Sequence, residues 1–468
     1  MHPAGRRTRP RRRSDHPRGR GYPGHVDAEF DAGNAIVCPG FIDLNALADI
    51  DHALFDSWPD AGRRLGLVWS QEYLRDHGPV FEREQERFRR EFAISQLIRN
   101  GITTMMPIAA ETYKQWCEDY RDLADTAEAV TALGIRAYFG PSYRTAVPYT
   151  DGRRMLLHHD ELQGLAGLDE AVRFVQDYDG TAAGLIRGAL LPARIETQTE
   201  RTLRLTRQAA DELGVPVRLH AAQGLFEVER IVEATGRRPL PYLADLGFLA
   251  PKTFIPHAWT VPGHPLMPAK YGTGDDIALL ADAGTAVIFC PIPTGHYGGC
   301  LHTYDSYRDA GVRIVLGTDS APPNLIKAMD MAMIMMKTIT GDRTAAAPAD
   351  LFRSATLDPA EALGRDDLGR LAVGAQADYF VLDLAASHVG PHADPIRTLI
   401  MNGDGRDISR VVVAGRTVVE DSKIITVDDS SYLGRAQEFL DDYIAHHTLS
   451  DYAHRRIEEL QPPSFPLR

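Results

Sequence analysis

The sequence predicts a (β/α)₈ barrel of the TIM type with a small β-sandwich formed mainly by the C-terminal part. Two observations support this fold class. Short apolar runs, each long enough for one strand, alternate with longer stretches of helical periodicity over most of the chain, which is typical of a parallel barrel. After Ser354 the pattern changes to two-residue alternation, which is typical of antiparallel strands.

Eight apolar runs account for the predicted barrel strands. They cover residues 34–44, 100–109, 134–143, 183–193, 214–223, 252–260, 283–292 and 311–319. Between them, apolar residues recur three to four positions apart, as in the stretch 200–214, which Gly214 is expected to end. The methionine-rich run 329–337 predicts the buried face of the helix after the eighth strand, with Asn324 as its N-terminal cap.

The antiparallel strands are expected within residues 369–384 and 408–427, with Ala414 and Gly415 as a turn. We therefore divide the chain as follows: 1–26, an arginine-rich segment expected to be disordered; 27–36, a remnant of the β-sandwich; 37–360, the barrel; 361–428, the β-sandwich; and 429–468, a helical tail.

Composition excludes several classes of protein. Hydrophobic residues make up 44% and charged residues 25% of 468 residues, which is ordinary for a globular enzyme. The sequence contains no run of about 18 apolar residues, so it predicts no membrane span. The four cysteines form no CxxC pair, which favours a reducing cytoplasm and disfavours a cysteine zinc site. Residues 1–24 carry eight Arg and one Asp, but the remainder is acidic, which argues against a nucleic-acid partner.

Three polar side chains stand at the ends of predicted strands. His220 ends the fifth run, His257 the sixth and Asp319 the eighth. Active sites of such barrels lie at the carboxyl ends of the strands, so these side chains are expected to converge. Two imidazoles and a carboxylate suit one divalent metal, zinc or iron. The metal would lower the pKa of a bound water, and the carboxylate could take its proton.

Several segments resemble the amidohydrolase superfamily, in the branch that contains cytosine deaminase and the triazine chlorohydrolases. They are CPGFIDL, NGITTM, RLHAAQ, PHAWT, GTAVIFCP, GVRIVLGTDS and, most specifically, SATLDPAEALGRDDLGRLAVGAQADYFVLDL with VVVAGRTVVED. The resemblance covers about residues 30–425 and implies the same barrel fold and a hydrolase acting on a C–N bond of a small molecule. It also implies that His220, His257 and Asp319 bind a metal, with catalytic roles for His257 and Asp319, and it is compatible with a homodimer.

The sequence departs from the family pattern at two places in the expected site. The family has two metal-binding histidines at the end of the first strand, and here these positions are Asn45 and Leu47. Relatives often carry a catalytic glutamate at the position of Gln223. An amide can hydrogen-bond a substrate but cannot shuttle a proton. We therefore expect Asn45 and Gln223 to contact substrate, in a site with an altered or reduced set of metal ligands.

Five further residues are candidates for a role near the site. His52 could refill the metal site from the segment after the first strand. His296, beside glycines after the seventh strand, is a candidate substrate contact or acid–base group, and His302 a weaker one. Trp259 suits core packing and a substrate pocket wall equally. Glu227 is expected on the surface of the helix that follows Gln223.

Three functional hypotheses remain open from the sequence. The first is a cytoplasmic hydrolase acting on a C–N bond of a small, cyclic or amidine-like substrate, in which a metal on His220, His257 and Asp319 activates water. In the second, the same residues form a metal-free acid–base set. The third is a non-catalytic relative that binds a small ligand.

Overall fold

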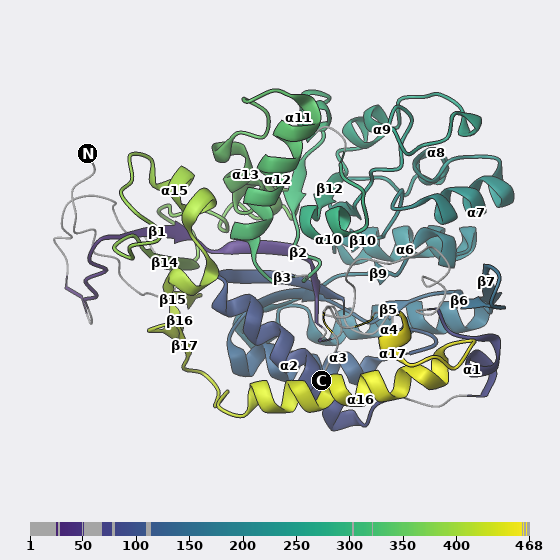
Figure 1. Cartoon of the computed structure of the whole chain (residues 1–468), viewed down its shortest axis with the longest axis horizontal. Coiled ribbons are helices and arrows are strands. Elements are labelled where there is room, and N and C mark those ends of the chain that lie inside the picture. Colours follow the sequence, from purple (N-terminus) through teal and green to yellow (C-terminus); the bar gives the residue numbers. More distant parts are fainter. Residues whose placement is uncertain are drawn as a thin grey trace.

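A parallel barrel forms the centre of the molecule (Figure 1). The computed structural model describes residues 25–26, 29–48, 50, 68–76, 80–108, 114–301, 304–320, 322–460, 462 and 465. The barrel strands are β2 (Phe41–Leu47), β3 (Ile102–Ile108), β4 (Arg136–Phe139) continued by β5 (Ser142–Tyr143), β8 (Ile186–Gly188) continued by β9 (Leu191–Pro192), β10 (Val217–Arg218), β11 (Thr253–Pro256), β12 (Ala286–Phe289) and β13 (Ile314–Leu316). Seven of the eight predicted apolar runs contain one of these strands, and the first run, 34–44, contains β1 (Ala35–Pro39) of a second sheet and the start of β2. The predicted (β/α)₈ barrel is confirmed.

The barrel closes through backbone contacts between two four-stranded parallel sheets, β2-β3-β4-β8 and β10-β11-β12-β13. On one side, β-bridges join Leu190 to Val217 and Arg194 to His220. On the other side, the Asp319 N–H donates to the Asn45 carbonyl at 2.8 Å. The second closure brings the end of the last strand against the end of the first.

Helices surround the barrel, and sequence signals account for the ends of several. α6 ends at Gly214 (φ 71°), as predicted. α12 begins after Asn324, whose side chain accepts the N–H groups of Ile326 and Lys327, and it buries Met329, Met333 and Met336. The helices are α1 (Gln71–Asp76), α2 (Arg83–Arg99), α3 (Tyr120–Leu133), α4 (Glu161–Tyr178), α5 (Thr181–Gly184), α6 (Glu200–Leu213), α7 (Leu225–Thr235), α8 (Pro239–Asp245), α9 (Asp276–Asp282), α10 (Pro291–His296), α11 (Tyr304–Asp309), α12 (Leu325–Thr340), α13 (Pro348–Ser354), α14 (Leu357–Ala362), α15 (Pro395–Asn402), α16 (Tyr432–Ser450) and α17 (Ile457–Leu460).

A small antiparallel sheet flanks the barrel, in the order β1-β14-β15-β16-β17. Its strands are β1 (Ala35–Pro39), β14 (Tyr379–Asp383), β15 (Ile408–Val413), β16 (Arg416–Glu420) and β17 (Lys423–Ile424). The predicted turn at Ala414 (φ 48°) and Gly415 (φ 80°) joins β15 to β16. A short hairpin, β6 (Ala146–Thr150) with β7 (Met155–His159), extends from the barrel at the opposite end of the view (Figure 1).

One stretch of chain belongs to both sheets. β1 pairs with β14, and after Gly40 the chain continues directly as β2 of the barrel. Figure 1 shows the two as consecutive purple arrows. A Cβ atom at Gly40 would lie 2.0 Å from Thr103 Oγ1, so only glycine fits this crossing. The small sheet is therefore covalently continuous with β2, the barrel strand that carries Asn45.

Helix α16, near the C-terminus, packs against α2 (Figure 1). Phe81 and Phe439 stack with ring centroids 4.3 Å apart, and Tyr432 packs edge-on against Phe88. In the part of the chain that the structure describes, no helix has the length and apolar character that a membrane crossing requires.

Candidate active site

Two histidines, an aspartate and an asparagine meet at the carboxyl ends of the barrel strands. Asn45 Nδ2 donates to Asp319 Oδ1 at 3.0 Å, and His257 Nε2 lies 4.0 Å from Asp319 Oδ2. The rings of His220 and His257 have centroids 5.6 Å apart. The structure thus brings together four of the predicted site residues, one each from the ends of β2, β10, β11 and β13.

The two imidazoles are buried and held in the neutral form. His220 is 6% and His257 is 4% exposed. Burial lowers the pKa of both groups well below 6.5, and the positive charge of Arg194 lowers each further. His220 Nδ1 donates to the Ala193 carbonyl at 3.0 Å, which directs Nε2 away from it. His257 Nε2 is buried and has no hydrogen-bond partner, an arrangement that costs free energy unless a ligand or water completes it.

Backbone strain accompanies this arrangement. His257 (φ 68°) and Asp319 (φ 47°) both adopt the left-handed backbone conformation, which residues other than glycine rarely take. The buried Asp43 supports the strand that leads to Asp319, because its carboxylate accepts the Thr318 N–H at 3.2 Å and the Thr318 hydroxyl at 2.5 Å. Strained residues of this kind persist where the surrounding structure holds them, and they cluster at functional sites.

A buried guanidinium lies within the barrel below the histidines. Arg218, the last residue of β10, is 2% exposed and donates to the carbonyls of Leu44 (3.1 Å), Met106 (2.6 Å) and Pro107 (2.8 Å). The pairing of β2 with β3 shifts register between Asp43 and Ala46, in the stretch that holds the Leu44 carbonyl. The charge of Arg218 lowers the pKa of His220 and acts in the same direction on Asp43.

Gln223 follows His220 on a turn that is held from both sides. Glu227 accepts the backbone N–H groups of Ala222 and Gln223, the latter at 2.9 Å. From the next strand, the N–H groups of Trp259 and Thr260 both donate to the Ala222 carbonyl. The expectation that Glu227 lies on the surface is wrong: it is 2% exposed, because the first turn of α7 folds its carboxyl back onto the preceding backbone.

The remaining candidates lie apart from this cluster or outside the described residues. His296 is exposed at the end of α10 and makes no hydrogen bond, ion pair or ring contact with Asp319 or with the two histidines. Trp259 is half-buried and packs on His264, with ring centroids 4.9 Å apart. His52 and His302 fall outside the described residues.

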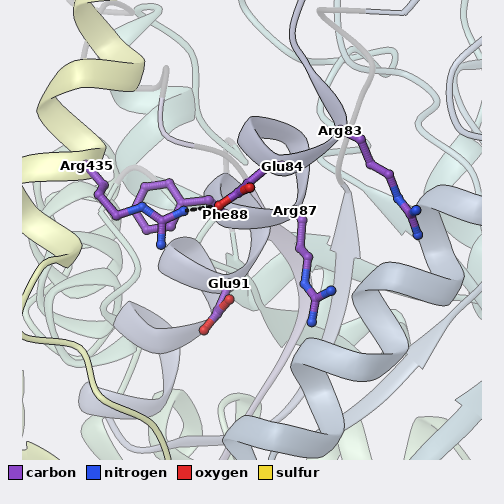
Figure 2. A pocket seen from close by; sticks show the side chains of 6 residues that line it. All are labelled: Arg83, Glu84, Arg87, Phe88, Glu91 and Arg435. Atoms are coloured by element: carbon purple, nitrogen blue, oxygen red, sulfur yellow. Dashed lines mark hydrogen bonds and ion pairs between the residues drawn. The ribbon is translucent and has the colours of Figure 1, made fainter.

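A groove of about 490 Å³ lies elsewhere, between α2 and α16 (Figure 2). Its lining residues are Arg83, Glu84, Arg87, Phe88, Glu91 and Arg435. Its charges are largely compensated, since Arg435 lies over the Phe88 ring and pairs with Glu84, and Arg83 pairs with Asp125. The groove holds none of the clustered site residues, so we place the active site at the barrel mouth.

Sequence reasoning missed three polar residues of the centre, namely Asp43, Arg218 and Cys290. Each is 2% exposed or less, and Cys290 Sγ lies 3.6 Å from Asn45 Nδ2. A signal was present for two of them: Asp43 and Arg218 are charged residues inside otherwise apolar strand runs. A charge in such a position is seldom tolerated unless it is paired.

The described residues do not fit the metal ion that the fold implies. One feature favours a metal, because His220 donates Nδ1–H to a carbonyl as metal-binding histidines usually do. However, the Asn45 amide donates through Nδ2 to Asp319, and the Leu47 side chain has no atom that can coordinate a metal. Within residues 29–48 and the other described segments, no three His, Cys, Asp or Glu side chains are arranged to hold a metal ion.

An eight-stranded barrel with imidazoles and a carboxylate at the carboxyl ends of its strands defines a class, the hydrolytic (β/α)₈ enzymes. Comparison with known proteins makes the class specific. Residues 36–418 match the model of the amidohydrolase family. The chain therefore belongs to this family and is a hydrolase acting on carbon–nitrogen bonds other than peptide bonds.

Similar proteins include a 5-methylthioadenosine/S-adenosylhomocysteine deaminase of Halobacterium salinarum, which is 28% identical over 88% of each chain. Among solved structures, an adenosine deaminase of Xanthomonas campestris with bound zinc has a TM-score of 0.69 at 24% identity, covering 87% of this chain and 86% of its own. The atrazine chlorohydrolase of Arthrobacter aurescens, complexed with zinc, has a TM-score of 0.71 at 22% identity, covering 87% of this chain and 89% of its own. The structural similarities show the shared fold, and zinc accompanies that fold in these relatives.

Proposed function

We propose that this chain is a deaminase that replaces an amino group on the ring of a small nucleoside-like molecule with oxygen. One observation carries the proposal. The buried Nε2 of His257 has no partner and faces Asp319 Oδ2 across 4.0 Å. A separation of this size between two polar atoms is suited to a bridging water, which would be the nucleophile. The deaminase relative of Halobacterium salinarum supports the choice of substrate class.

The reaction follows from these positions. The bridging water attacks the ring carbon that bears the amino group, so that a C–O bond forms. Asp319 takes a proton from the water and returns it to the amino nitrogen, and the C–N bond breaks with release of ammonia. His257, neutral because burial lowers its pKa, orients the water through Nε2. The Gln223 amide, whose Oε1 is buried without a partner, hydrogen-bonds the ring edge of the substrate.

The proposal is tested with the purified full chain and a panel of nucleosides that carry an exocyclic amino group. Adenosine, its 5′-substituted derivatives and cytidine are compared with the matching oxo-nucleosides as controls. Ammonia is measured by a coupled assay, and the product by its ultraviolet spectrum. We expect substrate-dependent ammonia release from a subset of the amino-nucleosides. A folded protein that binds such a nucleoside and returns it unchanged would instead support a non-catalytic binding protein.

A further inference from the structure

We propose that the positive charge at this centre is supplied by the protein itself, so that the centre works without a resident divalent cation. In this arrangement Arg218 provides the charge from below, and the Asn45 amide takes the place of a metal against Asp319. The inference rests on the proposed function only for the reaction. Its statement about metal binding stands on the geometry of the centre.

Arg218 places a permanent cation inside the barrel. A guanidinium remains protonated at any physiological pH, and this one is 2% exposed and fixed by three backbone carbonyls of β2 and β3. Its charge lies next to the centre, because the guanidinium donates to the carbonyl of Leu44, the residue before Asn45, and Arg218 precedes His220 by two residues on the same strand end. A dication held by His220 would therefore be repelled by a neighbouring charge that cannot move away or deprotonate.

Asn45 fills the position where a metal would meet Asp319. It is fully buried, and its Nδ2 lies 3.0 Å from Asp319 Oδ1 and 3.6 Å from Cys290 Sγ. Both contacts use the amide as a donor, so partial positive charge faces the carboxylate. Gly317 leaves the space for this arrangement, because a Cβ there would lie 3.0 Å from Cys290 Sγ and 3.2 Å from Asn45 Cβ.

The second oxygen of Asp319 serves the reaction in this scheme. One oxygen is held by Asn45, while Oδ2 faces the unpartnered His257 Nε2. An amide hydrogen bond neutralises a carboxylate less than a directly bound dication does. Oδ2 of Asp319 is therefore the oxygen that is placed to accept a proton from a water at His257 Nε2.

The first test measures the metal content of the full chain. The protein is purified without chelators, incubated with zinc or with ferrous iron, passed through a desalting column and analysed by elemental mass spectrometry. We expect far less than one metal per chain and no rise in Tm on addition of zinc. Close to one zinc per chain in the wild type, lost in Asp319→Ala, would overturn the proposal.

The second test places histidines at Asn45 and Leu47, the two positions of β2 where the family has metal-binding histidines. We expect the double variant Asn45→His with Leu47→His to retain more zinc than the wild type and to gain Tm in its presence. The matched control, Asn45→Ala with Leu47→Ala, removes the same side chains without adding ligands and is expected to stay metal-free. Equal zinc in both variants, or none in a folded histidine variant, would overturn the role assigned to Asn45.

These results separate the inference from the proposed function. Ammonia release that persists after exhaustive dialysis against a chelator supports both. Metal-free protein that releases no ammonia from the nucleoside panel contradicts the proposed function alone. Release that is lost on chelation and restored by zinc contradicts the inference alone.

Discussion

At the level of single residues, the centre depends on two residues held in unfavourable backbone conformations. The left-handed backbone at His257 and Asp319 costs on the order of 1–3 kcal/mol each. The hydrogen bonds around Thr318 and Asp43 hold the second of these positions. The strained backbone lowers stability locally. The hydrogen bonds that hold it help to fix the separation between His257 Nε2 and Asp319 Oδ2.

We expect Asp319→Asn and His257→Gln each to lower kcat/KM by roughly 10²–10⁴-fold, because each removes a group that handles the attacking water. Asp319→Asn preserves size, and asparagine tolerates the left-handed conformation, so its Tm should change little. His257→Gln places a glutamine at a left-handed position and should lower Tm moderately. The measurement is steady-state ammonia release together with thermal unfolding. His296→Gln, at an exposed position outside the cluster, serves as the control and should leave kcat/KM unchanged. Wild-type turnover in Asp319→Asn would contradict the role given to this residue.

We expect Glu227 to make the free energy of unfolding depend on pH. Burial, and then the neighbouring Glu196 carboxylate, raise the pKa of Glu227 to about 8, whereas a glutamate in an unfolded chain ionises near pH 4.3. The folded state therefore holds a proton that the unfolded state has lost between these values. The corresponding stability is complete below about pH 4 and is lost as the pH rises through about 8.

The variant Glu227→Gln cannot titrate, so its free energy of unfolding should decline less than that of the wild type between about pH 5 and pH 8. Denaturant unfolding at several pH values measures this difference. The exposed Glu233 of the same helix provides the control, since Glu233→Gln should follow the wild-type curve. Parallel curves for Glu227→Gln and the wild type would show that Glu227 is ionised throughout.

At the level of secondary-structure elements, the cap of α12 is expected to contribute measurably to stability. Asn324 is 5% exposed and accepts two backbone N–H groups at the start of this helix. Asn324→Ala should lower the free energy of unfolding by about 1 kcal/mol. Asn324→Asp retains an acceptor oxygen and should lose less. Denaturant unfolding of the two variants measures the difference, and equal losses would mean that the side chain stabilises the helix by packing alone.

The barrel strands could be predicted because each apolar run is short and ends in a turn signal or polar residue. The positions of His220, His257 and Asp319 at strand ends followed from the same pattern. Arg218 was missed because alternation along a strand gives no information about carbonyls on the strands opposite. Glu227 was misplaced because helical periodicity does not show that a first-turn carboxyl can accept N–H groups from the preceding turn.

At the level of the whole molecule, a buried ion pair joins the barrel to the small sheet. Arg136 on β4 donates to Asp378, which precedes β14, at 3.1 Å, and both residues are 3% exposed. Asp378 also accepts the Ala414 N–H at 2.6 Å, and its carbonyl accepts the Gly40 N–H at 3.0 Å. The pair therefore lies where the two sheets meet.

Arg136→Ala leaves the Asp378 carboxylate buried without its cation and should cost about 3–5 kcal/mol of stability. Arg187→Ala, which breaks the partly exposed pair with Asp179, should cost about 0–1 kcal/mol. Calorimetric unfolding of both variants gives the comparison. A small loss in Arg136→Ala would show that water enters the joint and solvates Asp378.

β1 continues directly into β2, so the site depends on the exact number of residues between the two sheets. Side chains alternate between the two faces of a strand, so each added residue between Pro39 and Phe41 reverses the direction of every side chain that follows. One inserted residue would turn Asp43 away from Thr318 and Asn45 away from Asp319 while leaving β1 paired with β14. A second inserted residue would restore the direction but advance Asn45 by about 7 Å along the barrel. Natural variation in length at this crossing should therefore be absent, although each of the two sheets alone could tolerate it.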